Sequence, residues 1–282
     1  MHDVLSRPAP PPDETLRYGA GPERVASVWW PRTGDRRSAA TVLFLHGGFW
    51  RAAWDRTHAG PLAAGLAEAG FTVCLPEYRR SGQESVGGGW PGTFDDVAAA
   101  VDRLPELLGD RGGAPAAAGV VLAGHSAGGH LSLWAAARSR LPAGSRWHSS
   151  GAPPVRAVVA LAAVSDLTAC SDEGLGNGAA DALMGGSPAA HPDRYALADP
   201  ARLLPTGVPL GLLHGSRDDR VPAAMSRDFA ARARAAGDTV AAEELEGCDH
   251  FDLIDPRSAA WPAVLGALAA ATRSTTPDRR EP

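Results

Sequence analysis

The sequence contains no lysine, so all 27 of its Lys and Arg residues are arginine, and it has one isoleucine, Ile254, and one asparagine, Asn177. This bias, beside abundant Ala, Gly and Pro, is typical of a GC-rich genome and carries little functional information. The chain also lacks a sustained cluster of basic residues, and its net charge is −5. We therefore expect no nucleic-acid partner and a small neutral or weakly charged substrate.

Cysteine is scarce, and Cys74, Cys170 and Cys248 are far apart and odd in number. This argues against a disulfide framework and for a reducing compartment. The first residues, 1–14, contain prolines and no continuous apolar core, and no apolar run reaches the length of a membrane span. We expect a cytoplasmic protein with no membrane association. The sequence is compatible with a homodimer but does not decide the oligomeric state.

Motifs for metals and cofactors are absent from the sequence. The nine histidines include no HExxH pattern and no tight Cys/His group. Gly174–Gly178 has the composition of a phosphate-binding loop, but no apolar strand leads into it, and no glycine run is followed by GK[ST]. We therefore expect no metal and no cofactor.

Short apolar runs alternate with longer amphipathic segments along most of the chain. This pattern predicts an α/β fold, a mostly parallel central sheet flanked by helices, and 282 residues suffice for one large domain of this kind. Strands are expected at residues 25–30, 41–46, 71–75, 119–123, 155–162, 209–214 and 239–245. Helices are expected at residues 60–69, 94–108, 127–138, 223–236 and 258–271.

We expect one domain at residues 21–272, between a flexible amino-terminal segment, 1–20, and a flexible tail, 273–282. Residues 165–206 break the alternation with scattered Gly, Pro and Asp, and they offer only short helical stretches such as Gly178–Met184. A connection of that length without regular structure usually has a function. We therefore predict that it is a short lid insertion over the site.

Ser126 lies in the sequence GHSAGG, residues 124–129, directly after an apolar run and directly before a helical pattern. GxSxG between a strand and a helix is the nucleophile elbow, a turn too tight for ordinary residues at its glycine positions. The turn exposes the serine hydroxyl at the start of the helix. We predict that Ser126 is the nucleophile of a serine hydrolase.

A serine nucleophile needs a base and a third group that orients the base. In α/β-hydrolases these follow the serine in the order acid, then histidine. The segment HGSRDDRVP, residues 214–222, follows an apolar strand and offers two acids, Asp218 and Asp219, and His250 is the only histidine beyond it. We predict a triad of Ser126, Asp218 and His250, with Asp219 as the competing acid.

The sequence LHGGFW, residues 45–50, also follows an apolar strand. In this fold an HGG loop supplies main-chain N–H groups that stabilise the oxyanion, together with the residue after the nucleophile. We predict that Gly48, Phe49 and Ala127 are these donors. His46 is expected to brace the loop through hydrogen bonds.

These motifs resemble the α/β-hydrolase superfamily over about residues 25–268. HGGFW, GHSAGGHL and DHF are similar to the motifs of kynurenine formamidases (arylformamidases), with Gly129 in place of an alanine. The family pattern HGxxDxxVP selects Asp218 over Asp219, which then belongs to the turn. The resemblance implies hydrolysis of N-formyl-L-kynurenine to formate and L-kynurenine through a formyl-enzyme on Ser126.

The resemblance also implies a small acyl pocket with Trp50 and Gly47 as substrate-binding residues. Trp50 would enclose the formyl group, and Phe49, Trp90 and Tyr78 are candidates for the aryl platform. Trp90 and Tyr78 are equally compatible with ordinary aromatic residues of the core or of a loop anchor. The same loops occur in carboxylesterases of short-chain acyl esters, which is the first alternative. A non-catalytic binding protein on a hydrolase scaffold is the second, although such relatives usually lose a triad residue. The expected partner is a small acyl amide or ester.

Overall fold

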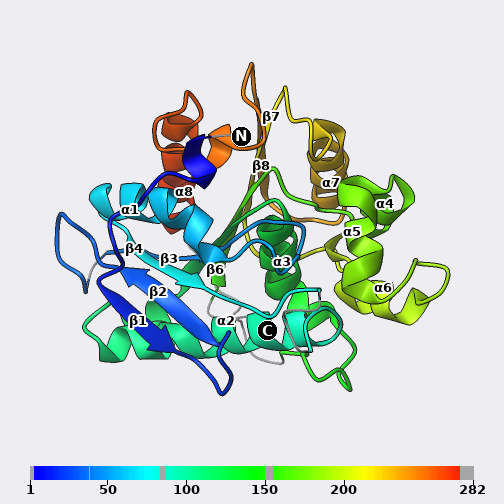
Figure 1. Ribbon diagram of the computed structural model, residues 1–282, viewed down its shortest axis with the longest axis horizontal. Helices are drawn as coiled ribbons and strands as arrows, with labels where there is room; N and C mark the ends of the chain where they lie inside the picture. Colours follow the sequence, from blue (N-terminus) through cyan, green and yellow to red (C-terminus); the bar gives the residue numbers. More distant parts are fainter. Residues whose placement is uncertain (1–2, 38, 83–86, 150–154, 274–282) are drawn as a thin grey trace.

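The structure is a computed structural model, which describes residues 3–37, 39–82, 87–149 and 155–273. Eight strands form one sheet in the order β1-β2-β4-β3-β5-β6-β7-β8. Strand β2 pairs antiparallel with β1 and β4, and every other neighbouring pair is parallel. Helices cover both faces of the sheet (Figure 1), which confirms the predicted α/β architecture.

Seven of the strands were predicted from their apolar runs. The bounds are β1 Glu14–Arg17, β2 Val25–Trp29, β3 Thr41–Leu45, β4 Thr72–Pro76, β5 Val120–His125, β6 Val155–Leu161, β7 Leu210–Gly215 and β8 Val240–Leu245. The sequence analysis missed β1, because this edge strand has four residues and buries only Leu16. A strand with one buried side chain leaves no apolar run to detect.

The helices include all five that were predicted. The α-helices are α1 Gly60–Glu68, α2 Gly92–Asp110, α3 Ala127–Ala136, α4 Leu167–Asp172, α5 Leu175–Met184, α6 Pro192–Ala198, α7 Ala223–Ala235 and α8 Trp261–Arg273. Short 3-10 helices are η1 Asp3–Leu5, η2 Arg56–Ala59, η3 Ala116–Ala118, η4 Ala137–Arg140, η5 Pro200–Arg202 and η6 Asp252–Ile254.

Alternating side chains of the central strands feed two hydrophobic cores. In β3, Leu43 and Leu45 pack in the core that includes α2, α3 and α7. Val42 and Phe44 pack in the other core, beneath α1 and α8. Because both faces are covered, the carboxyl ends of the parallel strands and the loops that follow them are the open part of the fold.

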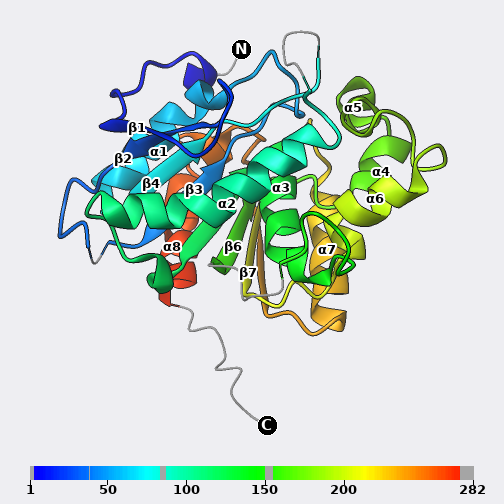
Figure 2. The ribbon, with the colours of Figure 1, turned by 90° about the horizontal axis from the view of Figure 1, so that it is seen from below.

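Residues 165–206 were expected to contain only short helical stretches, such as Gly178–Met184, within an otherwise irregular connection, and they are more regular than that. They contain α4, α5 and α6, which form a small helical group at one side of the sheet domain (Figure 2). Gly176, Asn177 and Gly178 have φ angles of +57°, +55° and +72°, a left-handed turn at the start of α5. Glycine favours left-handed backbone, so a glycine-rich sequence indicates a turn. The helix that follows the turn is therefore difficult to predict from the sequence.

The amino-terminal segment is packed against the domain, in contrast to the flexible segment predicted for residues 1–20. Val4 is 2% exposed and belongs to the core beneath α1 and α8. Arg7 donates to both carboxylate oxygens of Asp255, at 2.5 and 2.8 Å. Figure 1 shows this blue segment beside the orange segment that contains η6. Arg7 and Asp255 are 248 positions apart, so no local sequence pattern could predict this salt bridge.

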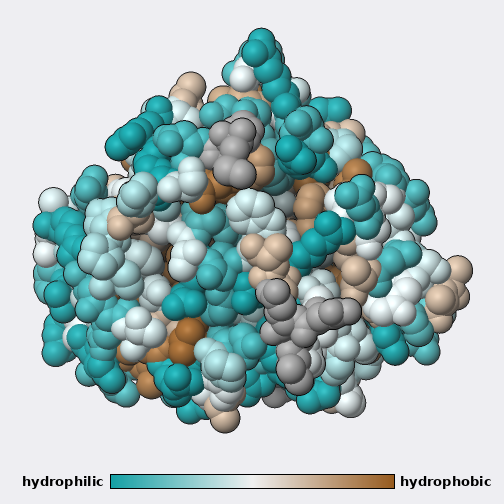
Figure 3. Space-filling model, viewed as in Figure 1, coloured by the Kyte–Doolittle hydropathy of each residue, from teal (hydrophilic) through white to brown (hydrophobic). Residues whose placement is uncertain are grey.

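None of the helices in the described part of the chain is both long and apolar enough to cross a membrane. The face in Figure 3 is largely hydrophilic, with hydrophobic residues in small separate groups. Cys74, Cys170 and Cys248 are buried free thiols, and burial raises the pKa of each.

Candidate active site

Ser126 occupies the turn between β5 and α3 with φ +55° and ψ −117°, a strained conformation for a residue with a side chain. The neighbouring glycines make this turn sterically feasible. A Cβ at Gly124 would lie 2.2 Å from the carbonyl oxygen of Gly128, and a Cβ at Gly128 would lie 1.9 Å from that of Leu45. Both positions of the GxSxG motif therefore require glycine, because neighbouring backbone atoms leave no room for a side chain.

His250 Nδ1 lies 2.6 Å from Asp218 Oδ2, at the ends of the loops that follow β8 and β7. Oδ1 of Asp218 accepts hydrogen bonds from the main-chain N–H groups of Arg220 and Val221, each at 2.8 Å. His214 Nε2 lies 3.0 Å from Oδ2. Burial by itself would raise the pKa of Asp218, but the hydrogen bonds from His214 and His250 hold it well below its usual value.

An ionised Asp218 accepts a hydrogen bond from His250, so the proton of the neutral imidazole resides on Nδ1. Nε2 is then left as the basic nitrogen. Ser126 and His250 line the same pocket, of about 290 Å³. The competing acid, Asp219, is 73% exposed and pairs with Arg220, so the structure brings Asp218 and not Asp219 to the imidazole.

The HGG loop is held from behind by a buried hydrogen-bond network. His46 is fully buried, and its Nε2 lies 2.9 Å from Glu77 Oε1. Tyr78 stacks on the His46 ring at 4.3 Å and donates its hydroxyl to the carbonyl of His46 at 2.7 Å. Burial opposes ionisation of Glu77, but His46 and nearby arginines lower its pKa to about 2. This geometry agrees with the expected bracing role of His46.

The loop beyond His46 runs through left-handed backbone at three consecutive residues. Gly48, Phe49 and Trp50 have φ angles of +110°, +50° and +55°. Within the described residues, the N–H groups of Gly48, Phe49 and Ala127 have no hydrogen-bond acceptor. Main-chain donors left unsatisfied beside a nucleophile are suited to a ligand oxygen.

The helical group at residues 165–206 contacts this loop directly. Arg51 donates through Nη2 to the carbonyls of Gly176 and Asn177, the latter at 3.1 Å. A Cβ at Gly176 would lie 2.7 Å from the Phe49 ring. The left-handed turn at the start of α5 therefore packs against Phe49 and Arg51, in the loop that carries the unsatisfied N–H groups. No residue of this group lines the 290 Å³ pocket itself.

The pocket joins residues from the amino terminus, the HGG loop and the loops after β5, β7 and β8. Its lining comprises Leu5, Gly48, Phe49, Arg51, Trp54, His58, His125, Ser126, Arg220, His250 and Phe251. Burial lowers the pKa of His58 to about 4, helped by the nearby His46. Burial also holds the pKa of His125 well below its ordinary value. Both imidazoles are therefore neutral at neutral pH.

Three of the predicted substrate-binding side chains lie elsewhere. Trp50 is fully buried, with its ring 5.1 Å from that of His130, because its left-handed backbone turns the side chain into the core. Tyr78 is 1% exposed beneath His46. Trp90 packs between Phe94 and Trp147, away from the pocket.

Gly47, also predicted to bind substrate, lies against the nucleophile turn. A Cβ there would lie 3.0 Å from His125 Nδ1 and 3.3 Å from Ser126 Cβ. Close packing of the two loops explains the glycine. Phe49 is the one predicted platform residue that lines the pocket.

Seven lining residues were given no role from the sequence: Leu5, Arg51, Trp54, His58, His125, Arg220 and Phe251. Three of them lie within ten residues of HGGFW, so the segment after this motif was the available signal. Trp54 is 38% exposed, the only exposed large hydrophobic residue in the part of the chain that the structure describes. Leu5 reaches the pocket only through tertiary packing, so no local pattern could reveal it.

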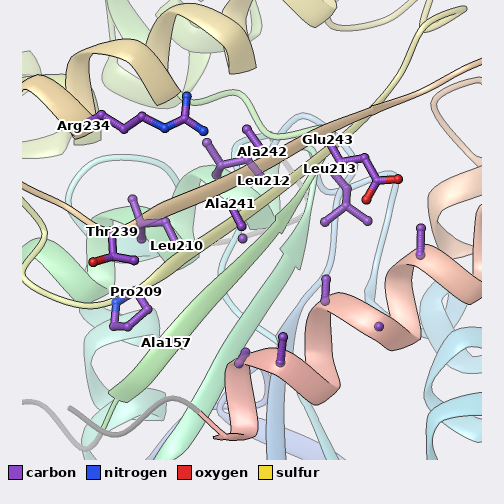
Figure 4. Close-up of a pocket in the computed structure, with 16 residues that line it drawn as sticks. Ala157, Pro209, Leu210, Leu212, Leu213, Arg234, Thr239, Ala241, Ala242 and Glu243 are labelled. Atoms are coloured by element: carbon purple, nitrogen blue, oxygen red, sulfur yellow. The ribbon is translucent and has the colours of Figure 1, made fainter.

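A larger cavity, of about 590 Å³, lies between β7, β8 and α8 (Figure 4). Small residues line it on both sides, including Ala241 on β8 and Gly266 on α8. Arg234 and Glu243 lie at its margins. None of the predicted site residues lines this cavity.

Comparison with known proteins identifies the family of this chain. Residues 28–232 match the model of the family described as BD-FAE. The chain belongs to the BD-FAE family. The matched region runs from β2 into α7, so it contains the HGG loop, the serine turn and Asp218, whereas His250 follows it.

This BD-FAE chain is similar to Esterase LipQ of Mycobacterium tuberculosis, with 30% identity over 245 residues. The match covers 84% of this chain and 57% of LipQ. LipM and LipC of the same organism are covered to 59% each. The chain thus spans less than two thirds of the length of these relatives.

Solved structures support the fold. A truncated carbohydrate esterase from gut microbiota superposes with a TM-score of 0.75 at 19% identity, over 93% of this chain and 99% of that one. Esterase B from Lactobacillus Rhamnosis has a TM-score of 0.74 at 20% identity, over 94% and 89% of the two chains. The α/β-hydrolase fold predicted from the motifs is therefore confirmed.

Proposed function

We propose that this protein is a carboxylesterase that cleaves short-chain acyl esters through a covalent acyl-enzyme on Ser126. The observation that carries the proposal is the 2.6 Å contact between His250 and Asp218, with His250 lining the same pocket as Ser126. Membership of the BD-FAE family and the similarity to Esterase LipQ support it.

In this proposal His250 Nε2 removes the proton of Ser126 as Oγ attacks the acyl carbon. Asp218 fixes the imidazole tautomer and stabilises its charged form. The N–H groups of Gly48, Phe49 and Ala127 donate to the oxyanion. His250 then protonates the departing alcohol, and water attacks the acyl-enzyme by the same steps to release the acid.

Replacing the nucleophile tests the proposal. Ser126→Ala is expected to lower kcat for p-nitrophenyl acetate by at least about 10⁴-fold, and to abolish labelling by a fluorophosphonate probe. The fold should persist, as circular dichroism can show. Ser145→Ala, at a partly exposed serine outside the pocket, is the matched control and should keep both signals. Wild-type turnover in Ser126→Ala would reject the assignment.

An arylformamidase acting on N-formyl-L-kynurenine is the second candidate. The HGGFW and GHSAGGHL motifs favour it, and the Phe49 and Trp54 rings in the pocket suit an aryl leaving group. The ratio of kcat/KM on N-formylkynurenine to that on p-nitrophenyl acetate separates the two. Negligible formamide turnover beside rapid ester cleavage would leave the carboxylesterase alone.

A non-catalytic binding protein on this scaffold is the remaining alternative. The contact between His250 and Asp218 and the strained turn at Ser126 argue against it, because neither is needed for binding alone. Failure of the fluorophosphonate probe to label folded wild-type protein would favour it.

A further inference from the structure

We propose that the pocket selects acyl esters or amides whose apolar body carries a carboxylate, with Arg51 and Arg220 as the residues that determine this specificity. The inference rests on the proposed function, whose site it uses. The pocket lining contains these two arginines and no aspartate or glutamate. A lining of this kind favours an anionic ligand over a neutral one.

The positive lining is a local property, because the chain as a whole has a net charge of −5. Asp218, the carboxylate that contacts the lining residue His250, has a side chain with no exposed surface. Its oxygens accept from two main-chain N–H groups and lie beside two imidazoles. Its charge is therefore stabilised by hydrogen bonds beneath His250, and it is not presented at the surface of the pocket.

Arg51 is held in place before any substrate arrives. Its Nη2 donates to the carbonyls of Gly176 and Asn177, which fixes the guanidinium at the wall of the pocket. Its Nε and Nη1 have no partner among the residues that the structure describes. A fixed guanidinium with free N–H groups at Nε and Nη1 is suited to a charge-assisted hydrogen bond with one oxygen of a carboxylate.

Arg220 supplies a second, adjustable charge. Its side chain is 53% exposed and pairs with Asp219, which is 73% exposed, at 3.2 Å. Exposed ion pairs of this kind contribute little to stability. A substrate carboxylate can therefore replace Asp219 as the partner of Arg220 at small cost.

The remaining lining residues indicate which kind of chemical group the pocket accommodates. Leu5, Phe49, Trp54 and Phe251 supply apolar and aromatic surface. A volume of about 290 Å³ accommodates a compact group. Together the walls and the arginines fit an ester of a small acid with an aromatic alcohol that bears a carboxylate.

A matched pair of esters tests this inference: 4-acetoxybenzoate, which is anionic, and its neutral methyl ester. The readout is the ratio of kcat/KM for the anionic ester to that for the neutral ester, in each variant relative to wild type. Dividing by wild type removes the difference in intrinsic reactivity between the two esters. Any general disturbance of the site lowers both terms and cancels.

Arg51→Gln is expected to lower this ratio about tenfold, as the loss of one charge-assisted hydrogen bond requires. Arg220→Gln is expected to lower it about threefold, because this arginine is exposed. The wild-type ratio should also fall as NaCl is raised. The matched control is Arg227→Gln, an exposed arginine on α7 that pairs with Glu244 outside the pocket, and its ratio should equal wild type.

Unchanged ratios in Arg51→Gln and Arg220→Gln would overturn the inference while leaving the esterase proposal intact. If Arg51→Gln does not fold, the exposed Arg220→Gln and the salt dependence decide the question. If neither ester is cleaved and Ser126 is not labelled by a fluorophosphonate, the proposed function fails and this inference fails with it.

Discussion

Replacing Asp218 by asparagine changes the hydrogen bonding of the site at one atom. Oδ1 of the asparagine can still accept from the N–H groups of Arg220 and Val221, which hold the side chain in its present orientation. The amide NH₂ then takes the place of Oδ2, facing His250 Nδ1 at 2.6 Å and His214 Nε2 at 3.0 Å. A donor in that place forces the proton of His250 from Nδ1 to Nε2.

The imidazole with its proton on Nε2 cannot take the proton of Ser126. We therefore expect Asp218→Asn to lower kcat by about 10⁴-fold, as loss of the correct tautomer does in a serine triad. This corresponds to about 5.4 kcal/mol of transition-state stabilisation. His214 can still donate to the carbonyl of Val221, at 2.9 Å, so the loop should keep its fold.

The assay is hydrolysis of p-nitrophenyl acetate at saturating substrate, with thermal unfolding followed by circular dichroism in parallel. Asp219→Asn is the matched control, because Asp219 carries the same chemistry one residue away and is 73% exposed. Its kcat should stay within about twofold of wild type, as is usual for an exposed substitution. A folded Asp218→Asn that retains a tenth of the activity, or an equal loss in Asp219→Asn, would refute the reasoning.

Two further predictions concern the supports of the site. Gly176→Ala adds a Cβ 2.7 Å from the Phe49 ring and should lower both kcat and stability. Gly178→Ala is the control, because it has similar left-handed strain but its added Cβ would have no atom within 4 Å. It should lower stability by about 1 kcal/mol and leave kcat unchanged. Equal losses of kcat in the two variants would contradict a role for the contact with Phe49. Burial lowers the pKa of His130 from 6.5 to about 4, so only the unfolded chain binds this proton in that range, and stability should decline as pH falls below 6.5. In urea unfolding at pH 7 and pH 5, His130→Gln should reduce that decline by up to about 1.4 kcal/mol per pH unit; an unchanged slope would contradict the assignment.

The sequence was sufficient to predict those parts of the fold and site that are determined by local backbone geometry. The nucleophile turn was predictable because Gly124 and Gly128 meet backbone atoms at distances that no side chain tolerates. The strands that pack on both faces were predictable from continuous apolar runs, as in β3. The order of acid and histidine predicted the contact between Asp218 and His250, since both follow parallel strands that end at one edge.

Prediction failed where side-chain direction or distant packing decides the outcome. Trp50 was placed at the substrate, but a φ of +55° turns it inward, and neither its residue type nor its neighbours encode that angle. The left-handed turn at residues 176–178 made a helical segment resemble an irregular loop. Leu5 and Arg51 became visible only when segments far apart in sequence were brought together.

The attachment of the amino terminus has a practical consequence for anyone who handles this protein. Because Leu5 lines the same pocket as Ser126 and Arg7 donates to Asp255, the first residue that the structure describes, Asp3, is two residues from the pocket wall. A purification tag or a fluorescent fusion joined to the amino terminus would therefore begin close to this pocket. Kinetic constants measured with such an extension in place would describe the appendage as well as the enzyme.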